Sequence, residues 1–223
     1  MDETVRAWVD GWVVSRGAAP PVAEPWGWTI DVGLYGHGTR HVFGTTGEGL
    51  DETTVRKVAG AVTGDGVWLK AFRDPAVVAG WLGDDWWIDP EPGCLMTIPL
   101  AAQQPPDVPA GHRLRTWERG GVTRVMLAAP DGSLAARGQI TPTGDTAVAD
   151  RIETAPEHRR KGLGSFVMRT LQSAAARQGA RTGVLAGTPA GRGLYEALGW
   201  EMRAWLTSAR HDPSGSARAG RPA

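Results

Sequence analysis

The sequence predicts an α/β (α+β) fold, with strands and helices in both halves of the chain. Residues 112–154 contain four strand-like runs separated by Gly-Gly, Pro-Asp-Gly and Pro-Thr-Gly turns, a pattern typical of consecutive hairpins. Residues 154–200 then contain an amphipathic helix, a short apolar strand and a second helix. The first hundred residues mix the same kinds of element, so we expect two α/β units in one chain.

The first half begins with a helix over residues 3–15. Its apolar side chains follow helical spacing: Val5, Trp8, Val9, Trp12 and Val13. Gly17 and the Pro20-Pro21 pair end this helix. The elements expected next are a hairpin over 28–45, a helix over 50–62, a strand over 67–72, a short helix over 74–83, and strands over 85–89 and 94–100.

The composition excludes several classes of protein. The formal net charge of the 223 residues is zero, so no overall field favours nucleic acid or an anionic membrane. Residues 1–100 hold 7 Lys/Arg and 14 Asp/Glu, whereas residues 101–223 hold 17 and 10. The single cysteine, Cys94, excludes an intrachain disulfide, and neither a signal peptide nor a membrane span is expected. A cytoplasmic protein is therefore expected, and the Arg-, Ala- and Gly-rich composition suggests a bacterial source.

A proline-rich stretch divides the chain. Residues 1–103 form the expected N-terminal α/β domain, 104–111 the linker, 112–210 the second domain and 211–223 a flexible tail. Within the second domain, strands are expected over 112–120, 122–133, 134–144, 146–154, 182–187 and 200–209, and helices over 163–179 and 191–200.

The turn that begins the first of these helices has the chemistry of a phosphate site. Gly162 and Gly164 let consecutive backbone N–H groups approach a ligand, and the positive end of a helix dipole attracts an anion. Positive charge gathers there in Arg159, Arg160 and Lys161. The spacing matches neither a P-loop nor G-x-G-x-x-G, because the terminal Lys-Ser/Thr and the third glycine are missing.

From Arg159 to Gly164 the turn reads R-x-x-G-x-G and resembles motif A of the GCN5-related N-acetyltransferases. The following strand and helix resemble the family's next motif, carried here by Thr188, Gly191, Leu194, Tyr195, Gly199 and Trp200. The resemblance covers residues 112–210. It implies a central mixed, mostly antiparallel sheet flanked by helices, acetyl-CoA as cosubstrate without a metal, and acetyl transfer to an amine.

The resemblance also implies which residues contact acetyl-CoA. These lie on the strand before the turn, in the turn and on the second helix: Ile152, Glu153, Thr154, Arg159, Arg160, Lys161, Gly162, Leu163, Gly164, Ser165, Thr188 and Tyr195. The strand residues would pair with the pantetheine arm through their backbone groups. The turn would donate N–H groups to the pyrophosphate.

Amide formation requires an unprotonated amine and a protonated leaving thiol, so a base and an acid are expected. By resemblance the acid is Tyr195; the alternative is a core aromatic. Asp150 stands where several members carry a glutamate that helps to deprotonate the amine, and an exposed carboxylate or a partner of Arg151 is an equal alternative. Glu153 is the second candidate base, and strand alternation directs it to the opposite face.

Two departures from the family pattern affect the acceptor side. Thr188 replaces the usual asparagine, and the first two strands of the second domain are joined only by residues 118–121 where typical members insert two helices. We therefore expect residues 1–103 to cover the acceptor side. A degenerate second copy of the fold, as in tandem members, is one form that this cover could take, although no second R-x-x-G-x-G is present.

Three functions fit these observations. The first is acetyl transfer to a small primary amine or amino acid, the second is a protein or peptide acetyltransferase, and the third is a catalytically lapsed CoA-binding regulatory module. An aromatic and acidic cluster in the first half is a candidate cation site, with core packing as the alternative: Trp81, Asp84, Asp85, Trp86, Trp87, Asp89 and Glu91. An exposed part of this cluster would favour a homodimer.

Overall fold

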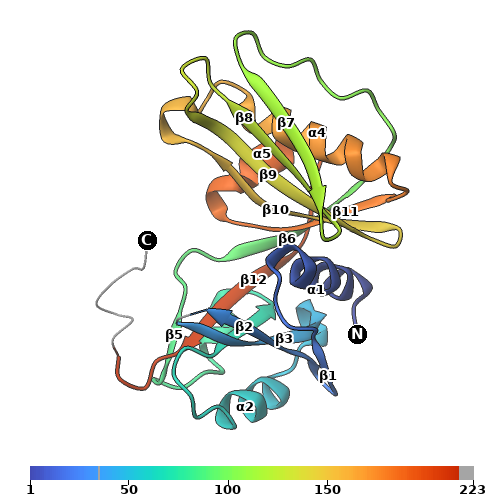
Figure 1. Ribbon diagram of the computed structural model, residues 1–223. Coiled ribbons are helices and arrows are strands. Elements are labelled where there is room, and N and C mark those ends of the chain that lie inside the picture. The colour runs from blue at the N-terminus through green and yellow to red at the C-terminus, as the bar shows by residue number, and fades with distance from the viewer. Residues whose placement is uncertain (35, 216–223) are drawn as a thin grey trace.

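The computed structural model describes residues 1–34 and 36–215 of the chain (Figure 1). The helices are α1 (Glu3–Arg16), α2 (Glu52–Gly60), α3 (Pro75–Ala79), α4 (Leu163–Arg177) and α5 (Pro189–Ala197), with 3-10 turns η1 (Gly47–Gly49) and η2 (Pro156–His158). The strands are β1 (Val22–Glu24), β2 (Gly27–Leu34), β3 (His37–Thr46), β4 (Trp68–Phe72), β5 (Trp86–Ile88), β6 (Gly93–Pro99), β7 (Arg113–Arg119), β8 (Val122–Ala128), β9 (Leu134–Thr143), β10 (Thr146–Thr154), β11 (Thr182–Gly187) and β12 (Glu201–His211).

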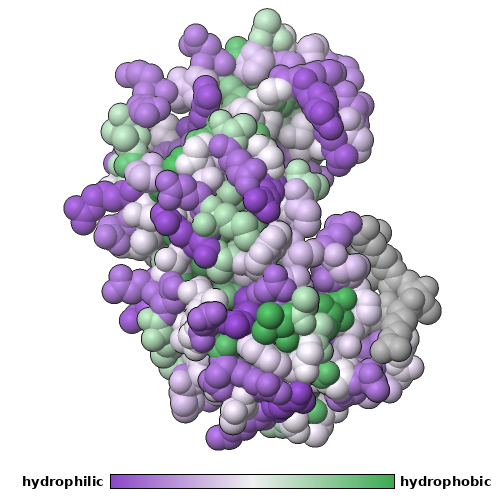
Figure 2. Space-filling model, turned by 180° about the vertical axis from the view of Figure 1, so that it is seen from behind, coloured by the Kyte–Doolittle hydropathy of each residue, from purple (hydrophilic) through white to green (hydrophobic). Residues whose placement is uncertain are grey.

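All the strands belong to one twisted sheet with the order β1-β2-β3-β4-β12-β6-β11-β10-β9-β8-β7, and β5 pairs with β12 beside this path. Figure 1 shows two lobes, with β6 and β12 passing between them. The space-filling view from behind shows the same two lobes with an indentation between them, and hydrophilic and hydrophobic residues interspersed over both (Figure 2). The α/β fold with a mixed, largely antiparallel sheet is confirmed.

The two halves exchange strands. β6, from the first half of the chain, lies between β11 and β12 and pairs antiparallel with both. The far end of β12, from the second half, pairs with β4 and β5. Residues 100–112 carry no strand or helix, as expected of a linker, but they do not separate two independent sheets. The domain boundaries expected at residues 103 and 112 therefore do not divide the sheet. Strand β6 of the first half pairs with strands of the second half, and β12 of the second half pairs with strands of the first.

Helix α1 covers the face of the second half's sheet opposite α4. Alternate residues of β10 show this, since Val148 packs in the cluster of α1 while Ala147 and Ala149 pack in that of α4. The approach is closest at Gly11, where an added Cβ would lie 2.4 Å from Cγ2 of Val148. The N-terminal helix thus packs on the opposite face of β9 and β10 from α4, and whether it covers an acceptor stays a prediction.

Local signals define the ends of α1. Asp2 caps its N-terminus by accepting hydrogen bonds from the backbone N–H groups of Thr4 and Val5, at 2.8 and 3.3 Å. Gly17, with φ of 63°, ends it in the left-handed conformation that glycine adopts without steric cost. Gly17 ends the helix as the sequence predicts, whereas the Asp2 cap is seen only in the structure.

The expected flexible tail, residues 211–223, begins too early. His211 ends β12 and is buried, and its backbone N–H donates to the carbonyl oxygen of Val67. The backbone N–H of Asp212, also buried, donates to the carbonyl oxygen of Asp85. Burial of His211 against the first half holds this segment in place. Residues 216–223 lie outside the described residues.

Candidate active site

The site begins where two parallel strands separate. β10 and β11 pair only over residues 146–148 and 182–184. Beyond that point β10 continues along β9, and β11 continues along β6. Within the described part of the chain, the edge of β10 that faces away from β9 has no strand partner after Val148. Its backbone groups at residues 152–154 are therefore placed to pair with an extended ligand.

A β-bulge between Asp150 and Glu153 changes the directions of the side chains that follow it in β10. Asp150 lies opposite Gln139 and Glu153 lies opposite Arg137, so Arg151 and Ile152 together face the single residue between the two β9 partners. Arg151 has φ of 53°, a left-handed conformation rare for arginine.

The bulge overturns one prediction. Strand alternation predicts that Asp150 and Glu153 point to opposite faces, but their β9 partners are two residues apart and therefore share a face. The extra residue of the bulge changes the alternation by one. Both carboxylates thus lie on the face that α1 covers further along the sheet.

The turn before α4 leaves backbone donors unpaired. Gly162, with φ of 76°, occupies the N-cap position and provides no side-chain cap. The first backbone bond of the helix runs from the N–H of Phe166 to the carbonyl oxygen of Gly162. The N–H groups of Leu163, Gly164 and Ser165 consequently have no partner within the helix, which is the arrangement that binds phosphate.

The basic side chains of the turn are exposed. Nε of Arg159 donates to the carbonyl oxygen of Thr154 at 3.3 Å, and Nζ of Lys161 donates to that of Glu157 at 3.0 Å. Arg160 has φ of 61°, so the turn contains two left-handed residues within three positions. These contacts leave the positive charges of the turn without a carboxylate partner among the described residues.

The two glycines of the turn serve different needs. A Cβ at Gly162 would meet nothing within 4 Å, so its positive φ is the requirement there. A Cβ at Gly164 would lie 3.0 Å from Cδ2 of Leu194 and 3.4 Å from Oγ1 of Thr154. Gly164 therefore allows α4, α5 and β10 to approach one another at the opening.

Helix α5 presents Tyr195 beside the end of β11. A Cβ at Gly187 or at Gly191 would lie within 3 Å of Cε2 of Tyr195, so both glycines make room for the ring. Burial, with contributions from Cys94 and Asp150, raises the pKa of Tyr195 to about 12. The phenol is therefore protonated throughout the neutral range. Thr188 caps α5, its hydroxyl accepting from the N–H of Gly191 at 3.3 Å.

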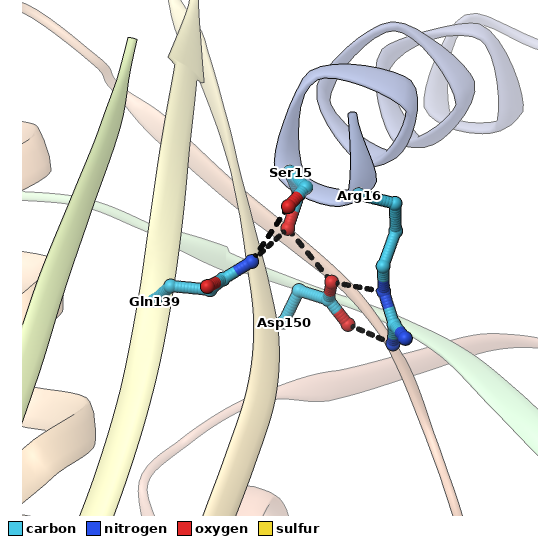
Figure 3. Close-up of polar contacts among 4 residues, drawn as sticks. All are labelled: Ser15, Arg16, Gln139 and Asp150. Carbon is cyan, nitrogen blue, oxygen red and sulfur yellow. Dashed lines mark hydrogen bonds and ion pairs between the residues drawn. The ribbon is translucent and has the colours of Figure 1, made fainter. Parts of the chain in front are cut away.

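Asp150 is held by the end of α1 (Figure 3). Arg16 binds it through two hydrogen bonds, of 2.6 Å from Nε to Oδ2 and 2.7 Å from Nη2 to Oδ1. The hydroxyl of Ser15 donates to Oδ2 at 2.7 Å, and Nε2 of Gln139 donates to the hydroxyl and carbonyl oxygens of Ser15. The Asp150 side chain is 11% exposed. Glu153, whose side chain is 54% exposed, pairs with Arg137 at 2.7 Å.

Sequence reasoning missed Ser15, Arg16 and Gln139. All three act through contacts between residues more than a hundred positions apart, and no local pattern marks them. The one available signal is Arg16 itself, a basic residue in the last turn of an amphipathic helix, and helix-dipole chemistry accounts for it equally well.

The aromatic cluster of the first half lies elsewhere. Trp86 is buried, packs at 5.1 Å against His211 and belongs to the core around α2 and β4. Trp81 packs against the same core, and Trp87 meets Trp68 edge-on. Core packing therefore accounts for these tryptophans. Trp81 and Trp87 are partly exposed, and the homodimer stays a prediction.

An open parallel strand pair, a bulge and a bare helix N-terminus thus meet at one site. A family model described as the acetyltransferase (GNAT) family matches residues 84–200, just over half of the chain. The chain belongs to this family of GCN5-related N-acetyltransferases. No curated protein matches the chain.

Solved structures of similar fold extend over the whole chain. A GCN5-related N-acetyltransferase from Kribbella flavida shares 19% identity over 98% of each chain, with a TM-score of 0.63. A putative GNAT-family acetyltransferase from Novosphingobium aromaticivorans shares 18% over 93% of this chain and 95% of its own, with a TM-score of 0.55. A tandem GNAT protein from the clavulanic acid biosynthesis pathway shares 17% over 96% of each chain, with a TM-score of 0.53.

Two further observations concern the described residues only. None of their helices combines the length and apolarity needed to cross a membrane. They contain no group of three or more His, Cys, Asp or Glu side chains arranged to hold a metal ion.

Proposed function

We propose that the protein transfers an acetyl group from acetyl-CoA to the primary amine of a small molecule or amino acid in the cytoplasm. The observation that carries the proposal is the separation of β10 from β11 beside the uncapped N-terminus of α4. An unpaired strand edge can bind the amides of a pantetheine arm, and bare helix N–H groups can bind its pyrophosphate. The free strand edge and the basic, uncapped turn fit the chemistry of the cosubstrate.

Acetyl-CoA, when bound, supplies an acyl group activated as a thioester. The residues expected to hold it are Ile152, Glu153 and Thr154 on the strand edge and residues 159–165 in the turn. The hydroxyl of Thr188 caps α5, so its contribution would come through the position of that helix.

Tyr195 is the proposed general acid. Its pKa of about 12 keeps the proton on Oη, from which it can be given to the leaving sulfur. Among the described residues no hydrogen-bond partner is found for this hydroxyl, which leaves it free to donate.

Of the two candidate bases, we favour Glu153. Both oxygens of Asp150 already accept hydrogen bonds from α1, whereas Glu153 lies on the same face and is half exposed. A water between the amine and Glu153 would carry the proton. Asp150 would then act as a positioning residue that fixes α1 against the bulge.

The test is a thiol-release assay with acetyl-CoA over a panel of amines, amino acids and peptides, using the wild type and Tyr195→Phe. We expect turnover to fall about a hundredfold in the variant while calorimetry shows unchanged CoA affinity. Equal turnover in the two proteins would remove Tyr195 as the acid.

Ion pairing at both carboxylates is the observation that favours a second function, a CoA-binding regulatory module. Tight CoA binding without thiol release on any acceptor would support that alternative. A preference for peptides over all small amines would instead favour a protein acetyltransferase.

A further inference from the structure

A small cavity of about 220 Å³ lies on the sheet face that carries Asp150 and Glu153. Its lining includes Trp117, Arg124, Met126, Arg137, Gln139 and Arg151. Strand register places these side chains together, because Trp117 lies opposite Arg124, Arg124 opposite Gln139, and Met126 opposite Arg137. The outer strands β7 and β8 thus form one wall of the cavity and β9 with the bulge forms the other.

The cavity adjoins the bulge of β10. Arg151 is a residue of the bulge itself. Gln139 donates to Ser15, whose hydroxyl in turn donates to Asp150. An acceptor lying in the cavity would therefore present one end to the opening between β10 and β11 and the other end to β7 and β8.

The lining carries more positive than negative charge. Arg137 pairs with Glu153. Arg124 donates only to the carbonyl oxygens of Arg119 and Val122, at 3.2 and 3.4 Å, and these do not neutralise its charge. No carboxylate lies within ion-pair distance of Arg124 or Arg151 among the described residues. Two guanidinium groups consequently face the cavity without a counter-ion. An anionic group of the acceptor would be attracted to these two guanidinium groups.

Trp117 adds an apolar wall. Its side chain is unusual among the described tryptophans in being exposed, with 43% of its surface accessible. A flat ring beside arginines suits a ligand whose short hydrocarbon stem ends in an anion.

We infer that the acceptor is an amine that also carries a carboxylate or phosphate, which Arg124 and Arg151 bind while the stem lies against Trp117. Guanidinium groups bind both oxyanions through paired hydrogen bonds. The inference rests on the proposed acetyl transfer and names the acceptor class for the same site.

The test compares four primary amines in the thiol-release assay: 4-aminobutyrate, its primary amide, butylamine and 3-aminopropyl phosphate. We expect kcat/KM for the two amines that carry an anionic group, 4-aminobutyrate and 3-aminopropyl phosphate, to exceed that for the two amines without one at least about tenfold. The better of the two anionic amines identifies the group that the site accepts. In Arg124→Gln and Arg151→Gln this preference should fall about tenfold, chiefly through KM.

Arg181→Gln is the matched control, because Arg181 is an exposed arginine 3.6 Å from Asp145 and does not line the cavity. It should keep the preference of the wild type. Equal kcat/KM for the amines with and without a carboxylate or phosphate would overturn the inference and leave acetyl transfer intact.

A binding measurement separates this inference from the proposed reaction. The unreactive probe 4-acetamidobutyrate is titrated by calorimetry into the wild type and into the double variant Arg124→Gln/Arg151→Gln. Binding that weakens at least about tenfold in the double variant supports the anion site even if no amine turns over. Equal binding, or none to the wild type, contradicts it.

Discussion

The segment β3-η1-α2-β4 in the first half and the segment β10-η2-α4-β11 in the second are built alike. Each is a strand, a 3-10 turn, a helix and a second strand parallel to the first. Each is followed by another helix and by a strand of the neighbouring region, α3 and β5 in one half and α5 and β12 in the other. The same arrangement of elements therefore occurs twice in this chain.

The turns differ in their chemistry. In the first half Asp51 caps α2, accepting from the N–H of Thr54 at 2.9 Å and from its hydroxyl at 2.8 Å. These hydrogen bonds hold the pKa of Asp51 below its ordinary value, so its negative charge persists at the helix N-terminus. In the second half Gly162 leaves the same position bare and basic residues surround it. Of the two turns, only the second leaves the N-terminal N–H groups of its helix without a side-chain cap, as a phosphate site requires.

The strands differ as well. β3 and β4 are still paired at Thr46 and Phe72, near the end of both strands, whereas β10 and β11 part after three residue pairs. A shared framework therefore makes a binding site only where the strands open and the turn is uncapped. The repeated order agrees with a degenerate second copy of the fold, which stays a prediction.

The largest expected effect comes from giving the second turn the chemistry of the first. Gly162→Asp places a carboxylate at the N-cap of α4, as Asp51 does at α2. Repulsion of pyrophosphate and occupation of the N–H groups should weaken CoA binding about a hundredfold, measured by calorimetry.

Gly162→Asn is the matched control, because it has the same size, tolerates positive φ and carries no charge. It should lose clearly less affinity than Gly162→Asp. Retained CoA affinity in Gly162→Asp would show that the turn before α4 does not bind the pyrophosphate.

The next effect concerns the contact between α1 and the bulge. Asp150→Asn and Arg16→Gln each leave one partner of a partly buried ion pair uncompensated, which should lower the free energy of unfolding by about 2 kcal/mol in urea titrations. If Asp150 only positions α1, the two variants lose similar amounts of turnover. A loss in Asp150→Asn more than about tenfold larger than in Arg16→Gln would instead identify Asp150 as the base.

Two glycines within helices test how closely each helix packs at that position. Gly11→Ala forces a Cβ into Val148 and should destabilise the protein by about 1–3 kcal/mol. Gly60→Ala meets nothing within 4 Å and should stabilise α2 by up to about 1 kcal/mol. Thermal unfolding followed by circular dichroism checks both signs, and a neutral Gly11→Ala would contradict the close packing of α1 on β10.

The smallest effect concerns Lys70 in the middle of β4. The corresponding strand of the second half, β11, has the apolar residues Val184 and Leu185 in its middle. Nζ of Lys70 donates to the Ser208 hydroxyl at 2.7 Å, and burial together with Arg40 lowers its pKa to about 7 from 10.5. Between these values the unfolded chain binds the extra proton, so wild-type stability should rise with pH across this window.

Lys70→Met should lack this rise. The free energy of unfolding is measured by urea titration at pH 7 and at pH 9.5. Between these values the wild type should gain on the order of 1 kcal/mol more stability than the variant does. A shift of the opposite sign would show that Lys70 is stabilised as a cation.

Much of this structure could be predicted because its signals are local. Asp74 caps α3 and Gly199 follows α5 with φ of 88°, each at the position that its residue type indicates. The spacing from Arg159 to Gly164 and the helix with Tyr195 identify the family from residues close together in the chain. The bulge at Arg151 was not predictable, because an arginine in the left-handed conformation has no sequence signature.

The order of helices and strands in both halves, the uncapped glycine turn before α4 and the place of Tyr195 on α5 followed from the sequence alone, since glycine conformation, helix capping and apolar periodicity act over a few residues. The tertiary structure alone decided that β6 and β12 cross between the halves, that Arg16 holds Asp150, and that Glu153 shares its face. The physical reason is that strand register and ion pairing join residues far apart in the chain, where many alternative partners have the same local pattern.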